Sequence, residues 1–481
     1  MLDDIRRSRA ARTTEKIDFS GCHHISGKTA RRLMPDYIGA TAVEKLSACK
    51  FNYFCRYGLG IDEKSPRSFN NAKRGDAIHF VLENVLRVYS GDPDSFFRLT
   101  RAELYVLSRK YLAEYCRLET NNEFSDDKRT QFLFNNIANS SADVLITVQA
   151  EFFARRYRPK FFELDIAGGD ERKYIIDNEQ SEPSAIPPAE LYSENESGRT
   201  DEPKAAEESG RYIEAKPLII RLENGIEVTV IGRIDRVDMF TERDENGGMD
   251  KVYVRVVDYK SSVREFDLNN TLHGSNLQML LYLFALCDAN KDNPTLTLCP
   301  GGVSYAPSKN TGAVEEELSP YRMLAMNYHP NELLISDDVT RRDIDGYLEF
   351  VLEKISSEGG LDEKTAEAIK KTFTPNALNM ADAESFDKLR GDVLAAVGKE
   401  LNALFDGDVS ALPLVCTETR RDVNGKGENK RKDPCEYCRF GDICGNAGKN
   451  AVMGEKARAY GTKTNPEWDN PYIKGEEGGN E

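Results

Sequence analysis

Two aspartates stand near the ends of two neighbouring predicted strands, where they could share a catalytic task. The connection between Asp235 and Asp258 contains Asn246-Gly247, the strongest short-range signal for a tight hairpin turn. If the hairpin is symmetric about that turn, residues whose numbers add to 493 face each other, and 235 + 258 = 493. The spacing therefore predicts that Asp235 lies directly across from Asp258.

This pairing indicates a metal-dependent reaction on a phosphate ester. Opposed residues of a hairpin have Cβ atoms about 5 Å apart, where two carboxylates repel unless a cation such as Mg²⁺ lies between them. Lys260 follows Asp258 by two residues, so strand alternation puts its ammonium on the same face. Phosphodiester hydrolysis needs this set, because metals activate a water and a cation stabilises the developing charge. Each residue alone would be an ordinary solvated strand-end residue, and only the combination predicts a nuclease.

Further motifs surround this pair, and together they resemble the RecB-like branch of the PD-(D/E)XK nuclease superfamily. That branch has a Gly-x-x-Asp strand, an Asp-Tyr-Lys strand, a following Gln-x-x-x-Tyr helix and an earlier Gly-x-x-x-His-x-x-Leu-Glu helix. The chain matches these motifs with Gly232 and Asp235, with Asp258, Tyr259 and Lys260, with Gln278 and Tyr282, and with Gly75, His79, Leu82 and Glu83.

The resemblance implies a fold and a role for each position. The fold would be α/β, with a restriction-endonuclease-like core in which helices flank a mixed central sheet. The implied Mg²⁺ ligands are His79, Asp235, Asp258 and the carbonyl of Tyr259. The implied catalytic residues are Asp235, Asp258, Lys260, Gln278 and Tyr282, with Lys260 as the catalytic cation. A lone helix histidine is more often a surface or core residue, so the assignment of His79 depends on the resemblance.

A second group of metal-binding residues lies near the end of the chain. Cys435, Cys438 and Cys444 follow a Cys-x₂-Cys-x₅-Cys spacing, and a fourth ligand is needed to complete a zinc or iron–sulfur site. Cys49 and Cys55 are the candidates. Zinc sites usually take two short pairs of cysteines, whereas iron–sulfur clusters accept a tight trio with one distant cysteine. The spacing favours a cluster over zinc.

The residues around Cys49 narrow the resemblance to the AddB family, the second subunits of bacterial AddAB helicase–nucleases, and to related CRISPR-associated exonucleases. In that family a Cys-Pro-Phe-x-x-Phe-x-x-Tyr-Gly-Leu stretch and a Cys-x₂-Cys-x₅-Cys trio hold a [4Fe–4S] cluster. The matching positions are Cys49, Phe51, Phe54, Tyr57, Gly58 and Leu59, with Lys50 in place of the proline. The resemblance implies a cluster that joins the N- and C-terminal segments through Cys49, Cys435, Cys438 and Cys444, and a structural role for Cys55.

The resemblance spans roughly residues 25–445 and implies a function and partners. It implies a Mg²⁺-dependent DNA exonuclease that acts at double-strand ends in recombinational repair, with DNA and a helicase subunit of AddA type as partners. Two alternatives remain open, a stand-alone CRISPR-type exonuclease and a non-catalytic zinc module that binds DNA. The presence of Asp235, Asp258 and Lys260 together argues against the non-catalytic alternative.

A sheet and a buried helix must position these residues. Strand-like composition appears at 217–220, 227–231, 252–257 and 301–305. The apolar run 277–286 indicates a buried helix that follows the Asp-Tyr-Lys strand. Apolar residues at helical spacing predict helices within 42–46, 76–88 and 99–162, and residues 338–405 are expected to be mostly helical.

The same patterns divide the chain into segments. We expect a basic N-terminal extension at 1–35, a helical part of the nuclease domain at 36–177, an acidic disordered insertion at 178–210, the nuclease core at 211–310, a helical region at 311–410, a cluster-binding segment at 411–450 and a flexible tail at 451–481. The helical part carries the first cluster cysteine and His79.

The charge distribution leaves room for a DNA-binding surface despite a net charge of −16. Residues 178–210 hold two basic and nine acidic residues (2 − 9 = −7), whereas residues 1–80 hold fifteen basic and nine acidic residues (15 − 9 = +6). A basic, glycine-rich loop is expected at 420–432, so positive charge lies near both ends of the sequence. The longest apolar run is about half of what a bilayer crossing needs, and no signal peptide precedes it, which predicts a cytoplasmic protein that does not enter a membrane.

Overall fold

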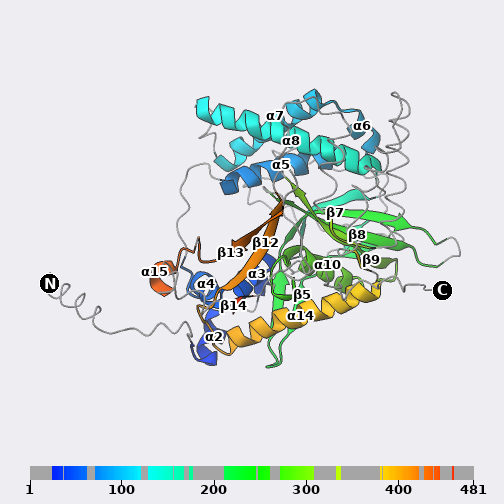
Figure 1. The fold of residues 1–481 in the computed structure, drawn as a ribbon. Helices are drawn as coiled ribbons and strands as arrows, with labels where there is room; N and C mark the ends of the chain where they lie inside the picture. Colours follow the sequence, from blue (N-terminus) through cyan, green and yellow to red (C-terminus); the bar gives the residue numbers. More distant parts are fainter. Residues whose placement is uncertain are drawn as a thin grey trace, which may run out of the picture.

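The computed structural model is a mixed α/β fold built on one central sheet (Figure 1). It describes residues 24–35, 37–61, 71–120, 128–154, 157–166, 173–176, 211–244, 248–260, 271–307, 332–336, 380–381, 383–421, 427–436, 438–444 and 458–459. The expected acidic insertion at 178–210 lies outside these residues, as do most of the segments 1–35, 338–379 and 451–481.

The central sheet has six strands in the order β11-β10-β9-β8-β7-β2. Their bounds are β2 Arg158–Asp165, β7 Arg233–Glu242, β8 Lys251–Lys260, β9 Thr297–Pro307, β10 Glu332–Ser336 and β11 Met380–Ala381. β2, β7 and β8 are antiparallel neighbours, whereas β8 and β9 run parallel, with α10 (Gln278–Ala289) between them in the chain. β10 pairs antiparallel with β9 and parallel with β11. The predicted mixed sheet is confirmed.

The pairing of β7 with β8 follows the register predicted from the hairpin turn. It runs from Arg236↔Val257 to Glu242↔Lys251, and each pair adds to 493 (236 + 257 = 493). The turn residues themselves, Asn246 and Gly247, lie outside the described residues. β8 is buried along nearly its whole length, as expected for a central strand covered on both faces.

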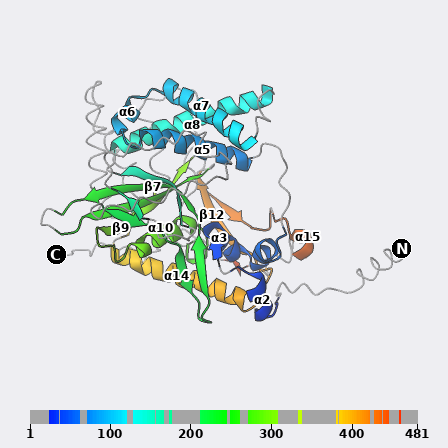
Figure 2. The same cartoon turned by 180° about the vertical axis from the view of Figure 1, so that it is seen from behind.

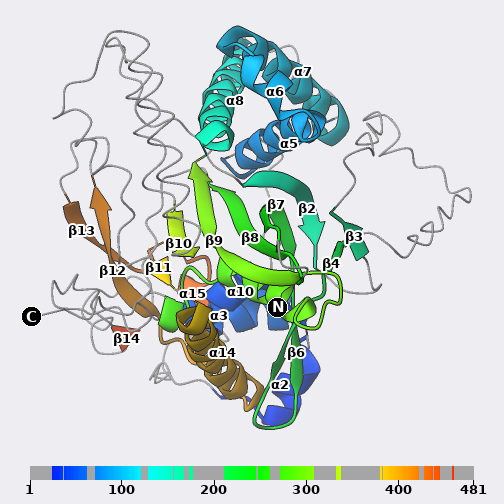
Figure 3. The ribbon, with the colours of Figure 1, turned by 90° about the vertical axis from the view of Figure 1, so that its right-hand side faces the viewer.

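Helices cover both faces of the sheet (Figures 1 and 3). One layer contains α5 (Asn71–Tyr89), α6 (Pro93–Arg98), α7 (Arg101–Thr120) and α8 (Lys128–Ala154). The other contains α3 (Ala40–Ala48), α10 and α14 (Ala383–Phe405). α5 contacts β2 and β7, whereas α10 contacts β8 and β9. The view from behind shows the same two layers on either side of the strands (Figure 2).

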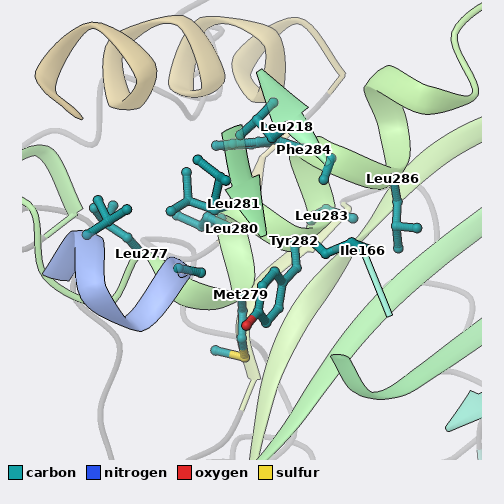
Figure 4. Close-up of a cluster of buried hydrophobic side chains, with 14 of the residues drawn as sticks. Ile166, Leu218, Leu277, Met279, Leu280, Leu281, Tyr282, Leu283, Phe284 and Leu286 are labelled. Carbon is teal, nitrogen blue, oxygen red and sulfur yellow. The ribbon is translucent and has the colours of Figure 1, made fainter. Parts of the chain in front are cut away.

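The helix α10 lies in the main hydrophobic core. Every residue from Met279 to Leu286 is buried, as expected for a helix that is apolar on all sides. Figure 4 shows its side chains together with Leu218 of β5 (Leu218–Arg221) and with Ile166, which follows β2. Burial of a leucine-sized side chain contributes about 1.5–3 kcal/mol, so this core fixes α10 firmly against the sheet.

Smaller elements complete the described fold. β1 (Tyr37–Gly39), β6 (Glu227–Ile231) and β5 form one small sheet, and β3 (Lys173–Ile175) pairs with β4 (Tyr212–Glu214). β13 (Gly427–Lys432), β12 (Leu414–Arg421) and β14 (Arg458–Ala459) form another. The remaining helices are α2 (Gly27–Leu33), α4 (Lys50–Tyr53), the π-helix η1 (Phe54–Gly58) and α15 (Gly441–Cys444).

Segments from the two ends of the described chain lie side by side. The Ile25 amide donates to the Gly407 carbonyl at 2.9 Å, and the Phe51 amide donates to the Ser410 carbonyl at 3.2 Å. Lys50 is largely buried and forms an ion pair with Glu400 at 2.5 Å. The early cysteine-bearing segment is therefore anchored on the C-terminal part of the fold.

The structure corrects three local expectations. The helical sequence pattern continues to Phe162, but α8 ends at Ala154 and residues 158–165 form the edge strand β2. The region 311–410, expected to be helical, contributes the strands β10 and β11 as well as α14. The expected loop at 420–432 includes most of β13, which pairs with β12. Within the described residues, no helix is long and apolar enough to cross a bilayer.

Candidate active site and cysteine group

Asp235 lies where the β7–β8 hydrogen-bond ladder ends. The last backbone pair joins Arg236 to Val257, and one residue further the Asp235 carboxylate itself accepts the Tyr259 amide at 3.0 Å. A side chain thus replaces a main-chain partner at this point. The two strands place Asp235 and Asp258 at the same end of the sheet, as the register predicted.

Lys260 is held by two neighbours at this end of β8. Its Nζ lies 2.5 Å from the Asp258 Oδ2 and donates to the Gln278 Oε1 at 3.3 Å. The Gln278 Nε2 donates to the Asp258 Oδ1 at 3.4 Å. Because Gln278 is the first residue of α10, the buried helix directs an amide onto both members of the ion pair.

His79 reaches the same place from α5, on the other face of the sheet. Its Nε2 lies 2.8 Å from the Tyr259 carbonyl oxygen, and its Nδ1 lies 3.4 Å from the Asp235 Oδ2. On this helix Ile78, Val81 and Leu82 are buried, which fixes the side from which His79 projects. Glu83, one turn later, forms an ion pair with Arg87 at 2.6 Å.

Tyr282 supports the site from one turn further along α10. It is almost completely buried, and burial raises the pKa of its phenol to about 12, with a hydrogen bond from Gln278 opposing that rise. A Cβ atom at Gly232 would lie 2.6 Å from a ring carbon of Tyr282 and against its hydroxyl. The Gly-x-x-Asp motif therefore needs a glycine because the Tyr282 ring occupies the space of a side chain.

The carboxylates of the site repel one another. Burial, followed by the charge of Asp235, raises the pKa of Asp258 to about 6, although Lys260 opposes the shift. Glu163 on β2 behaves similarly, because burial and the charges of Asp235 and Glu83 raise its pKa to about 7. Excess negative charge in a buried site is an environment that a cation would relieve.

Glu163 was not identified from the sequence. The β2–β7 register places Phe162 opposite Arg236 and Leu164 opposite Ile234, so Glu163 falls opposite Asp235. Its backbone adopts a positive φ of 49°, an uncommon conformation for a residue other than glycine. The sequence pattern favours a helix for this segment, and a helix gives no reason to align Glu163 with Asp235.

A fully buried charged network lies behind Tyr259. Arg236 donates to the Tyr259 hydroxyl at 2.8 Å, and Arg236 and Arg255 both donate to Asp238, at 2.8 and 2.7 Å. Tyr259 is also buried, and this burial raises the pKa of its phenol. The network fixes the tyrosine whose amide and carbonyl contact Asp235 and His79.

The donor set suits a hard divalent ion, although a preformed site is not seen. Among the described residues, no three His, Cys, Asp or Glu side chains already surround a common point that could hold a metal ion. The Asp235 and Asp258 carboxylates nevertheless lie together at raised local negative charge, beside the Tyr259 carbonyl and His79. Mg²⁺ prefers oxygen ligands of this kind.

The cysteines of the predicted cluster also come together. The Cys49 and Cys435 thiols each lie within range of the charges of Cys438 and Cys444, and burial is the main cause of the raised pKa of both. The Asn52 amide donates to the Cys438 sulfur at 3.3 Å. The four sulfurs of the predicted ligand set therefore gather from both ends of the described chain.

Cys55 belongs to the same neighbourhood. It is buried, and its pKa is raised to about 11, first by burial and then by the charges of Cys438, Cys49 and Cys444. Cys49 differs from it by its place at the start of α4, where the Phe51 and Asn52 amides donate to its sulfur. Amide donors stabilise a thiolate, so Cys49 suits a ligand role better.

The fold and this arrangement of side chains agree with a comparison to known families. Residues 37–445 match the PD-(D/E)XK nuclease superfamily, and the chain belongs to that superfamily. Its nuclease core therefore confirms the fold expected from Asp235, Asp258 and Lys260.

Relatives with a common name narrow the comparison to AddB proteins, each of which is named as a subunit of an ATP-dependent helicase/deoxyribonuclease. The protein from Thermoanaerobacter sp. (strain X514) is 24% identical over 92% of this chain, and that from Listeria innocua is 25% identical over 87%. The protein of that name in Clostridium acetobutylicum is 24% identical over 91% of the chain. The chain spans about a third of the length of these relatives, 33%, 31% and 32% respectively.

Proposed function

We propose that the chain is a cytoplasmic, Mg²⁺-dependent DNA exonuclease that acts at double-strand ends in recombinational repair. The observation that supports this proposal is the convergence of Asp235, Asp258 and Lys260 at one end of the β7–β8 pair. The superfamily to which the chain belongs consists of nucleases, and the relatives are named as deoxyribonuclease subunits.

The proposed chemistry divides between a metal and the chain's own residues. Asp235, Asp258, His79 and the Tyr259 carbonyl would hold Mg²⁺, which when bound would activate a water and neutralise phosphate charge. Lys260 stabilises the negative charge that develops on the scissile phosphate.

Second contacts hold these groups in place. Gln278 restrains Lys260 and Asp258, and Tyr282 restrains Gln278. His79 bridges Asp235 and the Tyr259 carbonyl, so the two strand ends cannot move independently.

We also propose that Cys49, Cys435, Cys438 and Cys444 bind a [4Fe–4S] cluster. The gathering of these thiols and the tight trio with one distant cysteine support it. The cluster would close a loop of 386 residues (435 − 49 = 386), which removes conformational entropy from the unfolded chain.

A helicase subunit of AddA type is the proposed partner. The name of the relatives describes one subunit of a helicase and deoxyribonuclease, and this chain covers about a third of them, 33% in the Thermoanaerobacter protein. Co-purification with such a helicase tests the proposal, and its failure at micromolar concentrations of both proteins would contradict it.

The nuclease activity is tested with end-labelled linear duplex DNA and Mg²⁺. Lys260→Ala should lower the rate by about 10²–10³-fold, because a positioned cation is lost. Lys251→Ala, at the exposed opposite end of β8, is the matched control and should keep full activity. Equal cleavage by wild type and Lys260→Ala would contradict the active site, and cleavage of closed circular duplex would contradict the exonuclease mode.

A further inference from the structure

The helix α10 begins without a cap of its own. Leu277 precedes its first residue and makes no side-chain capping bond, and the first turn contains no acidic residue. The first amides of a helix have no partner within it and require an external acceptor. A buried helix end without such an acceptor would be costly, so the acceptor must come from elsewhere.

Glu44 of α3 supplies that acceptor across 233 residues of sequence. Its Oε1 accepts the Leu277 amide at 2.8 Å and the Gln278 amide at 3.1 Å. A carboxylate at the positive end of a helix dipole is the favourable charge for this position. One side chain thus satisfies two amides of the helix that carries the active-site amide.

The loop that enters α10 is shaped to rest on α3. Gly274 has a φ of +90°, and a Cβ atom there would overlap the Ser47 side chain. Asn276, two residues later, has a φ of 58°, which asparagine tolerates better than most residues. The close approach at Ser47 and the capping bonds from Glu44 therefore come from the same face of one short helix.

The contacts continue from Glu44 into the active centre. The backbone of Gln278 is bound by Glu44, and its side chain is bound to Lys260 and Asp258. A shift of a few tenths of an ångström in the Gln278 backbone would lengthen contacts that already stand at 3.3 and 3.4 Å. Hydrogen bonds weaken quickly beyond this length.

We propose that Glu44 is a positioning residue of the nuclease, which fixes the start of α10 so that Gln278 holds Lys260 and Asp258 in their reactive arrangement. This inference rests on the proposed function. Glu44 also lies five residues before Cys49, at the end of the same helix, so the cysteine group and the active centre share α3 as a support.

The test compares Glu44→Ala, Glu44→Gln and Gln278→Ala in Mg²⁺-dependent cleavage. Glu44→Ala should lower kcat about tenfold or more with little change in KM, because charged hydrogen bonds to two amides are lost. Glu44→Gln keeps an acceptor oxygen and should restore most of the activity. In a Gln278→Ala background, Glu44→Ala should have less than about a twofold further effect, since both act through one side chain.

Glu103→Ala is the matched control. Glu103 accepts the Thr100 amide at 2.8 Å beside the start of α7, in the helical layer away from the active centre. Its loss should remove a comparable capping bond and leave kcat unchanged. Multiplicative effects of Glu44→Ala and Gln278→Ala, or an equal loss of activity in Glu103→Ala, would overturn the proposal.

A second readout does not depend on activity. Amide hydrogen exchange of Leu277 and Gln278 should accelerate in Glu44→Ala and return toward the wild-type rate in Glu44→Gln. Unchanged exchange would overturn the capping role whether or not the protein cleaves DNA. A wild-type protein without nuclease activity but with faster exchange in Glu44→Ala would instead contradict the proposed function alone.

Discussion

Arg236 and Asp238 lie two residues apart on β7, both wholly buried, and are joined by hydrogen bonds of 2.8 and 3.0 Å. Arg255 binds the same carboxylate from β8. A buried ion group of this kind adds little net stability by itself, but removal of one member leaves buried charge without compensation.

Asp238→Ala should therefore destabilise the fold strongly. It leaves two buried guanidinium groups without their carboxylate, and the expected loss in the free energy of unfolding is about 3–5 kcal/mol. Denaturant unfolding measures it. The control is Asp143→Ala, which removes a partially exposed ion pair with Arg101 at 2.8 Å and should cost less than about 1 kcal/mol. Similar losses in the two variants would contradict the role assigned to the buried network.

The stability of the metal-free protein should depend on the protonation of Asp258. Its pKa is raised from 3.8 to about 6. The folded state binds this proton more tightly than the unfolded chain does, so the contribution is full below pH 3.8 and is lost as the pH rises to about 6. The expected decrease is about 2–3 kcal/mol.

Unfolding by urea in the presence of a chelator, between pH 4 and 7, measures this decrease. Asp258→Asn cannot titrate and should lack that part of the pH dependence. Glu163 is present in both proteins, so the difference between their curves isolates Asp258. Identical pH dependence in wild type and variant would argue against the raised pKa.

Gly232→Ala should displace Tyr282. The added Cβ atom would lie 2.6 and 2.8 Å from two ring carbons of Tyr282, closer than real contacts allow. Overpacking of this kind costs about 1–3 kcal/mol. The cost should shrink when Tyr282 is replaced by leucine, and thermal unfolding of both single variants and the double variant measures the coupling.

The matched glycine for this experiment is Gly398 in α14, where an added Cβ atom meets nothing within 4 Å. Alanine has a higher helix propensity than glycine, so Gly398→Ala should stabilise the protein by up to about 1 kcal/mol. A Gly232→Ala protein as stable as wild type would show that Tyr282 does not occupy the space next to Gly232.

The cysteine assignments lead to a prediction about iron content. After anaerobic purification, wild type and Cys55→Ser should be brown and contain iron, whereas Cys49→Ser and Cys438→Ser should lose most of both. Iron analysis and visible absorbance measure the outcome. Iron loss in Cys55→Ser with retention in Cys49→Ser would exchange the two roles, and zinc in place of iron in the wild type would contradict the cluster.

The active centre was largely predictable because its main determinants are local. The alternation of β7 and β8 and the hairpin spacing place Asp235 near Asp258, and Lys260 follows by strand periodicity. Gln278 and Tyr282 stand one turn apart on a helix whose apolar run is evident. The buried pair Arg236 and Asp238 was not recognised, because strand-end charges usually lie in solvent.

Other parts depend on contacts that the sequence pattern does not contain. β2 was missed because a register shift after Pro159 and the positive φ of Glu163 interrupt its alternation. The capping role of Glu44 depends on a partner 233 residues away. Where burial of a residue is decided by a distant segment, local periodicity carries no signal of it.

The bonds between residues 25–52 and the C-terminal part of the fold also bear on biosynthesis. Phe51 leaves the ribosome 359 residues before its partner Ser410 (410 − 51 = 359). At about 5–20 residues per second, the nascent chain waits roughly 20–70 s for that partner. Closure of the domain is therefore a late event of translation, and the nascent nuclease stays incomplete during most of its own synthesis.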